Sequence, residues 1–109
     1  MKLNALVLIL ALAALQARAD EPVGFAQGTK LMTKYHCESC HSIDKTMSGP
    51  SFRDVAKHYA DDPHAREEVA NNILNGSSGA WGMPLPMPPT AVPDGDLKPL
   101  VDWILSLTQ

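Results

Sequence analysis

Apolar residues recur at helical spacing in four stretches of the chain, and none of its segments shows the alternation of a β-strand. The first helix is expected over residues 25–35, and its apolar members are Phe25, Leu31, Met32 and Tyr35. Gly28 weakens this helix unless it permits the close approach of another helix. The second helix is expected over residues 51–60, with Phe52, Val55, Ala56 and Tyr59 on one face.

The third helix has clear start and stop signals. Asp62 is the expected N-cap, Pro63 takes the first helical position, and Gly76 ends the helix. Its buried stripe is expected to comprise Ala65, Val69, Ala70, Ile73 and Leu74.

The last helix is predicted to end near Leu107, with either Asp94 or Asp96 as its cap. Pro99 favours Asp96, because proline is tolerated only in the first turn of a helix. The inward-facing residues are expected to be Leu97, Leu100, Val101, Ile104 and Leu107, and Trp103 borders them. The preceding stretch, residues 77–93, contains so many prolines that both helix and central strand are excluded. The pattern predicts an all-α domain of about four short helices joined by long loops.

The N-terminus has the pattern of a secretory signal peptide. Met1 and Lys2 precede an apolar run over residues 6–15, and Ala17-Arg18-Ala19 has the form of a cleavage site. The apolar run is too short to span a bilayer comfortably. We therefore expect residues 1–19 to be removed and residues 20–109 to form one domain, located in the periplasm without membrane insertion.

The predicted mature domain is small and acidic. Removal of Lys2 and Arg18 leaves seven Lys and Arg residues against 12 Asp and Glu, a net charge of −5. An acidic surface argues against nucleic acid or anionic lipid as a partner. A domain of this size buries a limited core and usually needs a disulfide, metal or cofactor to stabilise it.

Both cysteines lie in the string Cys37-Glu38-Ser39-Cys40-His41, which is typical of c-type haem attachment. Each thiol can add to one haem vinyl group, and His41 can then coordinate the iron as the proximal ligand. A disulfide between Cys37 and Cys40 would close too small a loop to stabilise the chain much. A thioredoxin-like redox pair would require a βαβ pattern, which is absent from the sequence. We therefore predict one covalent haem c.

The sixth iron ligand has several candidates, which are Met32, Met47, Met83, Met87, His36, His58 and His64. Met32 lies on an apolar helix face, where methionine is usually a core residue. His58 and His64 lie opposite the apolar stripes, and His36 is too close to Cys37 to reach across the ring. Met83 and Met87 are embedded in proline, which can hold a thioether at little entropic cost. Composition does not decide between these two.

Together with the haem string, three further motifs give the chain a family resemblance. These are Gly49-Pro50, the run from Asn75 to Gly82, and Pro86-Met87-Pro88-Pro89. With them the chain resembles the small bacterial class I cytochromes c of the c551/c552 type, a fold of helices and loops wrapped around one haem. The resemblance implies that Met87 is the distal ligand and that the Pro50 carbonyl accepts a hydrogen bond from His41. It also implies that the Trp81 indole donates to a haem propionate.

The chain departs from this family at two places. The stretch from Trp81 to Met87 is one residue longer, with Met83 in the added region. Asn72 stands where some relatives have a basic residue near the propionates. An uncharged residue there would stabilise the ionised propionates less.

Ligation by His41 and Met87 would close both faces of the iron and raise its reduction potential. The expected function is a soluble one-electron carrier of a periplasmic respiratory chain, not an enzyme. As a monomer it would meet a redox donor and an acceptor transiently. The alternatives are a small haem subunit of a periplasmic oxidoreductase, and a gas-binding haem protein whose methionine is labile. Lys34, Lys45 and Lys57 are expected to be ordinary solvated side chains.

Overall fold

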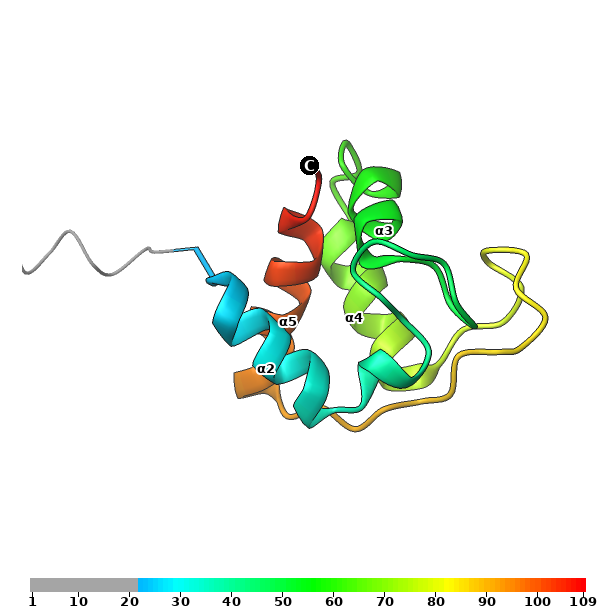
Figure 1. Cartoon of the computed structure of the whole chain (residues 1–109), viewed down its shortest axis with the longest axis horizontal. Helices are drawn as coiled ribbons and strands as arrows, with labels where there is room; N and C mark the ends of the chain where they lie inside the picture. The colour runs from blue at the N-terminus through cyan, green and yellow to red at the C-terminus, as the bar shows by residue number, and fades with distance from the viewer. Residues whose placement is uncertain (1–21) are drawn as a thin grey trace, which may run out of the picture.

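The computed structural model describes residues 22–109, so the predicted signal peptide lies outside the described part of the chain. The elements in chain order are helix α2 (Phe25–Lys34), the short 3₁₀ helix η1 (Cys37–Ser39) and helices α3 (Phe52–His58), α4 (Ala65–Asn75) and α5 (Asp94–Ser106) (Figure 1). Over residues 22–109 there is no strand, only one isolated bridge between Ser77 and Met87. The all-α prediction is confirmed.

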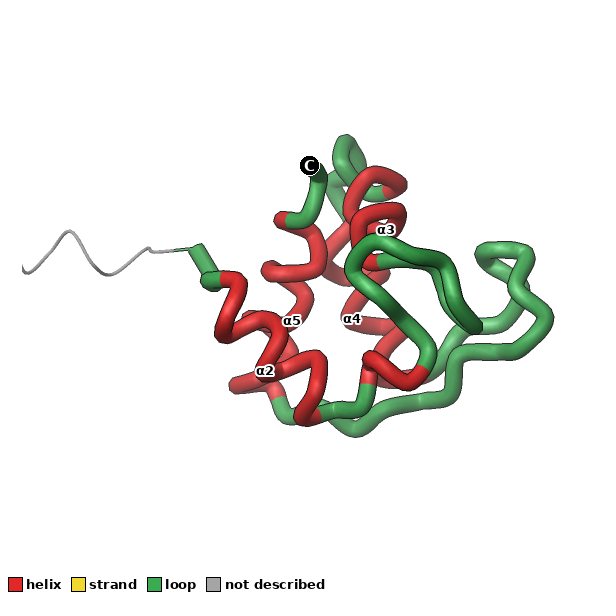
Figure 2. Tube along the Cα trace, viewed as in Figure 1, coloured by secondary structure: helices red, strands yellow, loops and turns green. Residues whose placement is uncertain are grey.

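Helix α5 is the centre of the fold, because α2, α3 and α4 each pack against it. The two long loops, over residues 40–51 and 76–93, extend from the helices toward the same side of the molecule (Figure 2). The predicted stripes supply most of the core, which comprises Leu31, Met32, Phe52, Ala56, Tyr59, Ala65, Val69, Ile73, Val92, Leu97, Leu100, Val101, Trp103, Ile104 and Leu107. Two predicted members, Phe25 and Leu74, are exposed instead. They lie at the first and the next-to-last residue of their helices, where little of the fold covers them.

Trp103 occupies the middle of the core, not its border as the periodicity suggested, and only 1% of it is exposed. Gly28 on α2 makes room for it: a Cβ atom at residue 28 would lie 2.1 Å from the Trp103 ring. The rings of Phe25 and Phe52 meet Trp103 edge-on, with centroids 6.2 Å and 5.9 Å away. The glycine that weakens α2 locally is therefore what allows α2 and α5 to pack.

We expect Gly28→Ala to destabilise the holoprotein by about 1–3 kcal/mol, the usual cost of overpacking a core. Gly95→Ala is the matched control, because Gly95 also lies in a helix and has nothing within 4 Å of its Cβ position. The control should be neutral or stabilising by up to ~1 kcal/mol through higher helix propensity. Guanidinium unfolding of both variants measures the difference, and equal effects would contradict the packing argument.

Two of the predicted helix starts are wrong. Helix α4 begins at Ala65 with His64 as its N-cap, and Asp62 instead accepts the His64 backbone N–H at 2.8 Å. Such a bond closes a local turn in which Asp competes with helix formation. Pro63 therefore lies in that turn and is not the first residue of the helix.

Helix α5 starts at Asp94 after Pro93, so Asp96 is in the first turn and Pro99 lies inside the helix. Proline there removes the donor for the carbonyl four residues earlier, that of Gly95. Because Gly95 is exposed and its surroundings are open, water can reach that carbonyl. The proline is tolerated for this reason.

The Asp96 carboxylate joins α5 to the end of α2. It accepts hydrogen bonds from the Tyr35 hydroxyl at 2.5 Å and from Lys34 Nζ at 2.9 Å. The hydrogen bond from Tyr35, followed by the one from Lys34, lowers the pKa of the Asp96 carboxyl from its ordinary value of 3.8. The same contacts raise the pKa values of Lys34 and Tyr35. These residues directly precede the haem-attachment string, so the cluster fixes where that string leaves α2.

We expect Asp96→Asn to be less stable than the wild type at neutral pH and to approach it in acid. The lowered pKa of Asp96 means that its contribution is present above pH 3.8 and is lost as the pH falls through the lower folded value. The matched control is Asp94→Asn on the same turn, which has no ion pair within residues 22–109. Unfolding midpoints between pH 2 and pH 7 measure the effect, and a difference that persists at the acid end would refute it.

Candidate haem site

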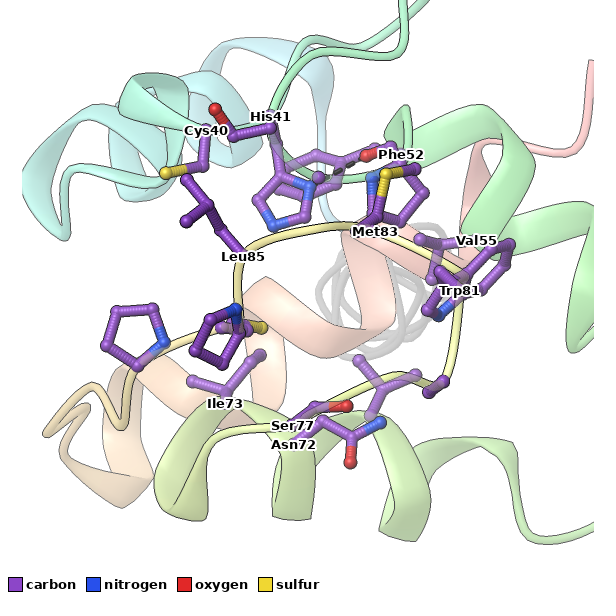
Figure 3. Close-up of a pocket in the computed structure, with 18 of the residues that line it drawn as sticks. Cys40, His41, Phe52, Val55, Asn72, Ile73, Ser77, Trp81, Met83 and Leu85 are labelled. Carbon is purple, nitrogen blue, oxygen red and sulfur yellow. Dashed lines mark hydrogen bonds between the residues drawn. The ribbon is translucent and has the colours of Figure 1, made fainter.

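A pocket lies between the helices and the two long loops. Its empty space, including the part that is open to solvent, is about 940 Å³. Phe52 and Val55 of α3, Val69 and Ile73 of α4 and Ile104 of α5 form its apolar walls. Figure 3 shows His41 and Phe52 on one side of the pocket and Ile73, Asn72 and Ser77 on the other. Among the described side chains that line it, none is Lys or Arg. An apolar lining with a few polar groups is typical of a site for a cofactor.

The haem-attachment string forms a tight turn directly after α2. His36 takes a left-handed conformation, with φ 59°, and η1 then brings the backbone N–H of His41 to the Cys37 carbonyl at 2.9 Å. Cys37 is half-buried, whereas Cys40 is exposed at the edge of the pocket. Burial raises the pKa of the Cys37 thiol to about 11, so it is protonated at neutral pH. The turn places both thiols and the imidazole within five residues of one short coil.

The His41 ring is held by three neighbours. Its Nδ1 lies 2.7 Å from the Pro50 carbonyl, to which it donates as the N–H tautomer. Phe52 stacks on the ring at 5.0 Å between centroids. A Cβ atom at residue 49 would lie 2.5 Å from His41 Cε1, so only glycine fits there. The contact with Pro50 leaves Nε2 as the nitrogen available to a metal, and such a hydrogen bond fixes a ligand's tautomer and orientation.

Met87 is anchored by its backbone to the segment that follows α4. Its N–H donates to the Ser77 carbonyl at 2.8 Å, and its carbonyl accepts from the Ser77 N–H at 3.0 Å. Gly76 is required for this contact, because a Cβ atom there would lie 2.6 Å from the Met87 carbonyl oxygen. The side chain of Met87 lines the pocket.

Met83 lines the same pocket from a more open stretch of the loop (Figure 3). Two glycines with positive φ, Gly79 at 75° and Gly82 at 65°, shape this stretch, and the Gly82 N–H bonds only to the Gly79 carbonyl. The remaining candidates for the sixth ligand lie elsewhere. Met32 is buried in the core, and Met47, His36, His58 and His64 are exposed.

Trp81 and Asn72 line the pocket as well, together with two polar residues that the sequence did not single out, Tyr59 and Ser77. Burial, followed by the nearby carboxylates of Glu68 and Asp62, raises the pKa of Tyr59. Its hydroxyl therefore stays protonated. Tyr59 fitted the helical pattern as a core residue, and Ser77 belongs to the run from Asn75 to Gly82 that supports the family resemblance, which assigned it no role of its own. The polar side chains of the pocket are thus neutral donors and acceptors.

These residues fit a c-type haem. The pocket offers the Cys40 thiol, an imidazole with a free nitrogen, two thioethers and apolar walls, and the second thiol, Cys37, lies in the turn just before Cys40. Soft sulfur and imidazole ligands are the ones that haem iron takes in cytochromes c. The neutral polar groups suit the carboxylates of the porphyrin edge.

The pattern of helices around such a pocket is that of a known family. A family model described as Cytochrome c matches residues 25–108, and the chain belongs to this family. None of the helices over residues 22–109 is long and apolar enough to cross a membrane.

Its relatives define the type more narrowly. Cytochrome c-551 of Pseudomonas aeruginosa is 49% identical over 70 residues, which are 64% of this chain and 66% of that protein. Cytochrome c-551 of Stutzerimonas stutzeri is 41% identical over 101 residues, 93% of this chain and 96% of that protein. The crystal structure of wild-type Nitrosomonas europaea cytochrome c552 has a TM-score of 0.68 and 44% identity, covering 72% of this chain and 98% of that chain. The chain is a class I cytochrome of the c-551/c-552 type.

The predictions of the fold and the cofactor are therefore confirmed. Homologues of this type are small monohaem electron carriers, not enzymes, and they exchange electrons with redox partner proteins. The cofactor is haem c, held covalently through two cysteines, which in this chain are Cys37 and Cys40.

Proposed function

We propose that the chain carries single electrons in a periplasmic respiratory chain, with the iron held between His41 and Met87. The bound haem supplies one iron that alternates between the ferric and ferrous states. The observation that carries the proposal is that His41 and Met87 come from distant segments, are each fixed by hydrogen bonds, and both line one pocket.

The two ligands have complementary tasks. The Pro50 carbonyl holds His41 with Nε2 free, and a hydrogen-bonded imidazole is a better donor to iron. Met87 supplies a thioether from a loop whose backbone is bonded to the end of α4. A thioether favours the reduced iron and so gives a high potential. With both positions filled, the site has no place for a substrate or gas, and the protein is left with electron transfer.

Trp81 is proposed to donate its indole N–H to a haem propionate, with Asn72 and Tyr59 as further neutral partners on the same pocket. Because these groups carry no positive charge, they stabilise an ionised propionate less than a basic residue would. The propionate edge is therefore expected to titrate closer to neutral pH than one paired with a cation.

The partners are proposed to be a donor and an acceptor protein that meet the monomer briefly. Met47 and Leu85, which are 49% and 63% exposed, belong to the two loops that form the pocket. Brief encounters between redox proteins use small interfaces. Export by the predicted signal peptide would place the carrier in the periplasm, where c-type haem is attached.

The test is to mature the full chain in a bacterium with a haem-attachment system and to record its spectra and reduction potential. We expect mass spectrometry to find one haem on the Cys37–Cys40 peptide. The reduced protein should be six-coordinate and should not bind added carbon monoxide. Prompt, stoichiometric binding of carbon monoxide would instead assign the chain to the gas-binding class. Co-purification with a catalytic subunit would make it a haem subunit of an oxidoreductase.

A further inference from the structure

His58 is an exposed histidine that the proposed function does not use. It is the last residue of α3, and its ring lies against Trp81, with 4.7 Å between the ring centroids and 53° between the planes. The adjacent Tyr59 ring meets it edge-on at 4.8 Å. Trp81 and Tyr59 both line the pocket. His58 therefore touches, from outside, two side chains whose other surfaces face the cofactor site.

We propose that His58 is a positioning residue whose charge is coupled to the oxidation state of the haem through Trp81. The inference rests on the proposed one-electron cycle and adds a regulation to it. When protonated, the imidazolium lies over the Trp81 ring, where a cation is attracted by the aromatic face. It also adds a positive charge beside a pocket that no Lys or Arg of the described chain lines.

Charged residues of both signs lie near the C-terminal end of α3, where His58 is the last residue. The charged residues near it in sequence or packed against its neighbour Tyr59 are Asp54, Lys57, Asp61, Asp62 and Glu68. Four of these five are acidic. Histidine is the side chain that changes charge between pH 5 and pH 8.

The direction of the coupling follows from the charges. Reduction adds one electron at the iron and lowers the charge of the haem, so a nearby imidazolium favours the reduced form. Each electron accepted is then accompanied by the uptake of a fraction of a proton from solvent at His58. By thermodynamic reciprocity, His58 is more protonated in the reduced protein than in the oxidised protein at the same pH. The potential falls as the pH rises and His58 loses its proton.

The size of the effect is modest. Two unit charges on the order of 10 Å apart, in surroundings close to water, change a binding equilibrium by about twofold. We therefore expect the equilibrium constant for reduction to fall about twofold between pH 5 and pH 8 because of this group alone. Added salt should reduce the effect, because His58 is exposed.

The experiment compares the pH dependence of the reduction potential in the holoprotein and in His58→Gln and His58→Lys. The glutamine variant should lack the roughly twofold step. The lysine variant should keep the high potential of the protonated state through this pH range. His64→Gln is the matched control, because His64 is also exposed and is in no ring contact with Trp81. It should retain the wild-type step. Any step from the propionates remains in all four proteins.

A second measurement separates this coupling from a purely structural role. In the reduced, diamagnetic holoprotein, the pH-dependent shift of the Trp81 indole N–H resonance should be equal in the wild type and in His64→Gln. In His58→Gln it should be smaller, because only the part caused by the propionates remains. A His58→Gln protein with a wild-type pH step would overturn the inference, while an unchanged six-coordinate spectrum would leave the proposed function standing. Loss of the six-coordinate spectrum in the wild type itself would overturn the proposed function.

Discussion

Met87→Ala should lower the reduction potential of the holoprotein by on the order of 100 mV, within the span of about 0.8 V that axial ligands cover. The wild-type protein should not bind carbon monoxide, whereas the variant should bind it stoichiometrically. The thioether stabilises the reduced iron, and its removal leaves one iron position to water or an added ligand. Potentiometric titration and the reduced spectrum with carbon monoxide measure the two effects.

The structure indicates that this substitution should spare the fold. Met87 is tied to Ser77 through backbone atoms only, and these bonds persist when the side chain is shortened. Gly76 still permits the close approach of the two segments, which depends on the Met87 carbonyl and not on its thioether. A lowered potential in Met87→Ala can then be assigned to the lost ligand, provided that the helical circular dichroism is unchanged.

Met83→Ala is the matched control, since the same residue type is removed from the same pocket and the same loop. It should change neither the coordination nor the carbon monoxide response. Met83 sits beyond two glycines of positive φ and has no backbone anchor comparable to that of Met87. If Met83→Ala opened the iron while Met87→Ala stayed six-coordinate, the distal ligand would be Met83 and the added residue in the loop would have shifted its register.

The helices could be predicted from the sequence because periodicity is a local property, and all four lie where it placed them. The starts of α4 and α5 could not, because they depend on competing local bonds. Asp62 accepts a hydrogen bond within a turn, and Asp96 accepts one from the Tyr35 hydroxyl at the end of α2. Trp103 shows a further limit. Its central position depends on a glycine 75 positions earlier in the chain, which only the packing of α2 on α5 reveals.

The residues of the site likewise divide into those that the sequence predicts and those that only the fold reveals. Spacing alone identifies Cys37, Cys40 and His41, because attachment of a c-type haem has the signature of two cysteines separated by two residues and followed at once by histidine. Residues contributed from a distance could be predicted only through the family resemblance, which supplied Pro50, Trp81 and Met87. Tyr59 was missed as a pocket residue because a buried tyrosine at a helical position resembles ordinary core. His58 was set aside as solvated, and it is exposed, yet its contact with Trp81 appears only in the fold.

Without its haem the chain is expected to be largely unfolded. The pocket is bordered by side chains from α3, α4 and α5, so removing the cofactor leaves apolar walls facing one another across empty space. Those walls are then exposed to water, and the apolar burial that the porphyrin supplies is lost. A domain of this size has a total stability of about 5–13 kcal/mol, and it also loses the covalent and axial links to the haem.

The measurement is far-ultraviolet circular dichroism of Cys37→Ser/Cys40→Ser, in which haem cannot be attached, against the holoprotein under the same conditions. The double variant should show little helix and no cooperative melt. Adding free haem tests whether the serine substitutions themselves damage the fold. His41 and Met87 can still bind free haem, so the helix content should return in proportion to the haem that is bound. A cooperative, native-like melt before haem is added would show that the helices close without the cofactor, and that the pocket is a preformed cavity and not the core that the chain folds around.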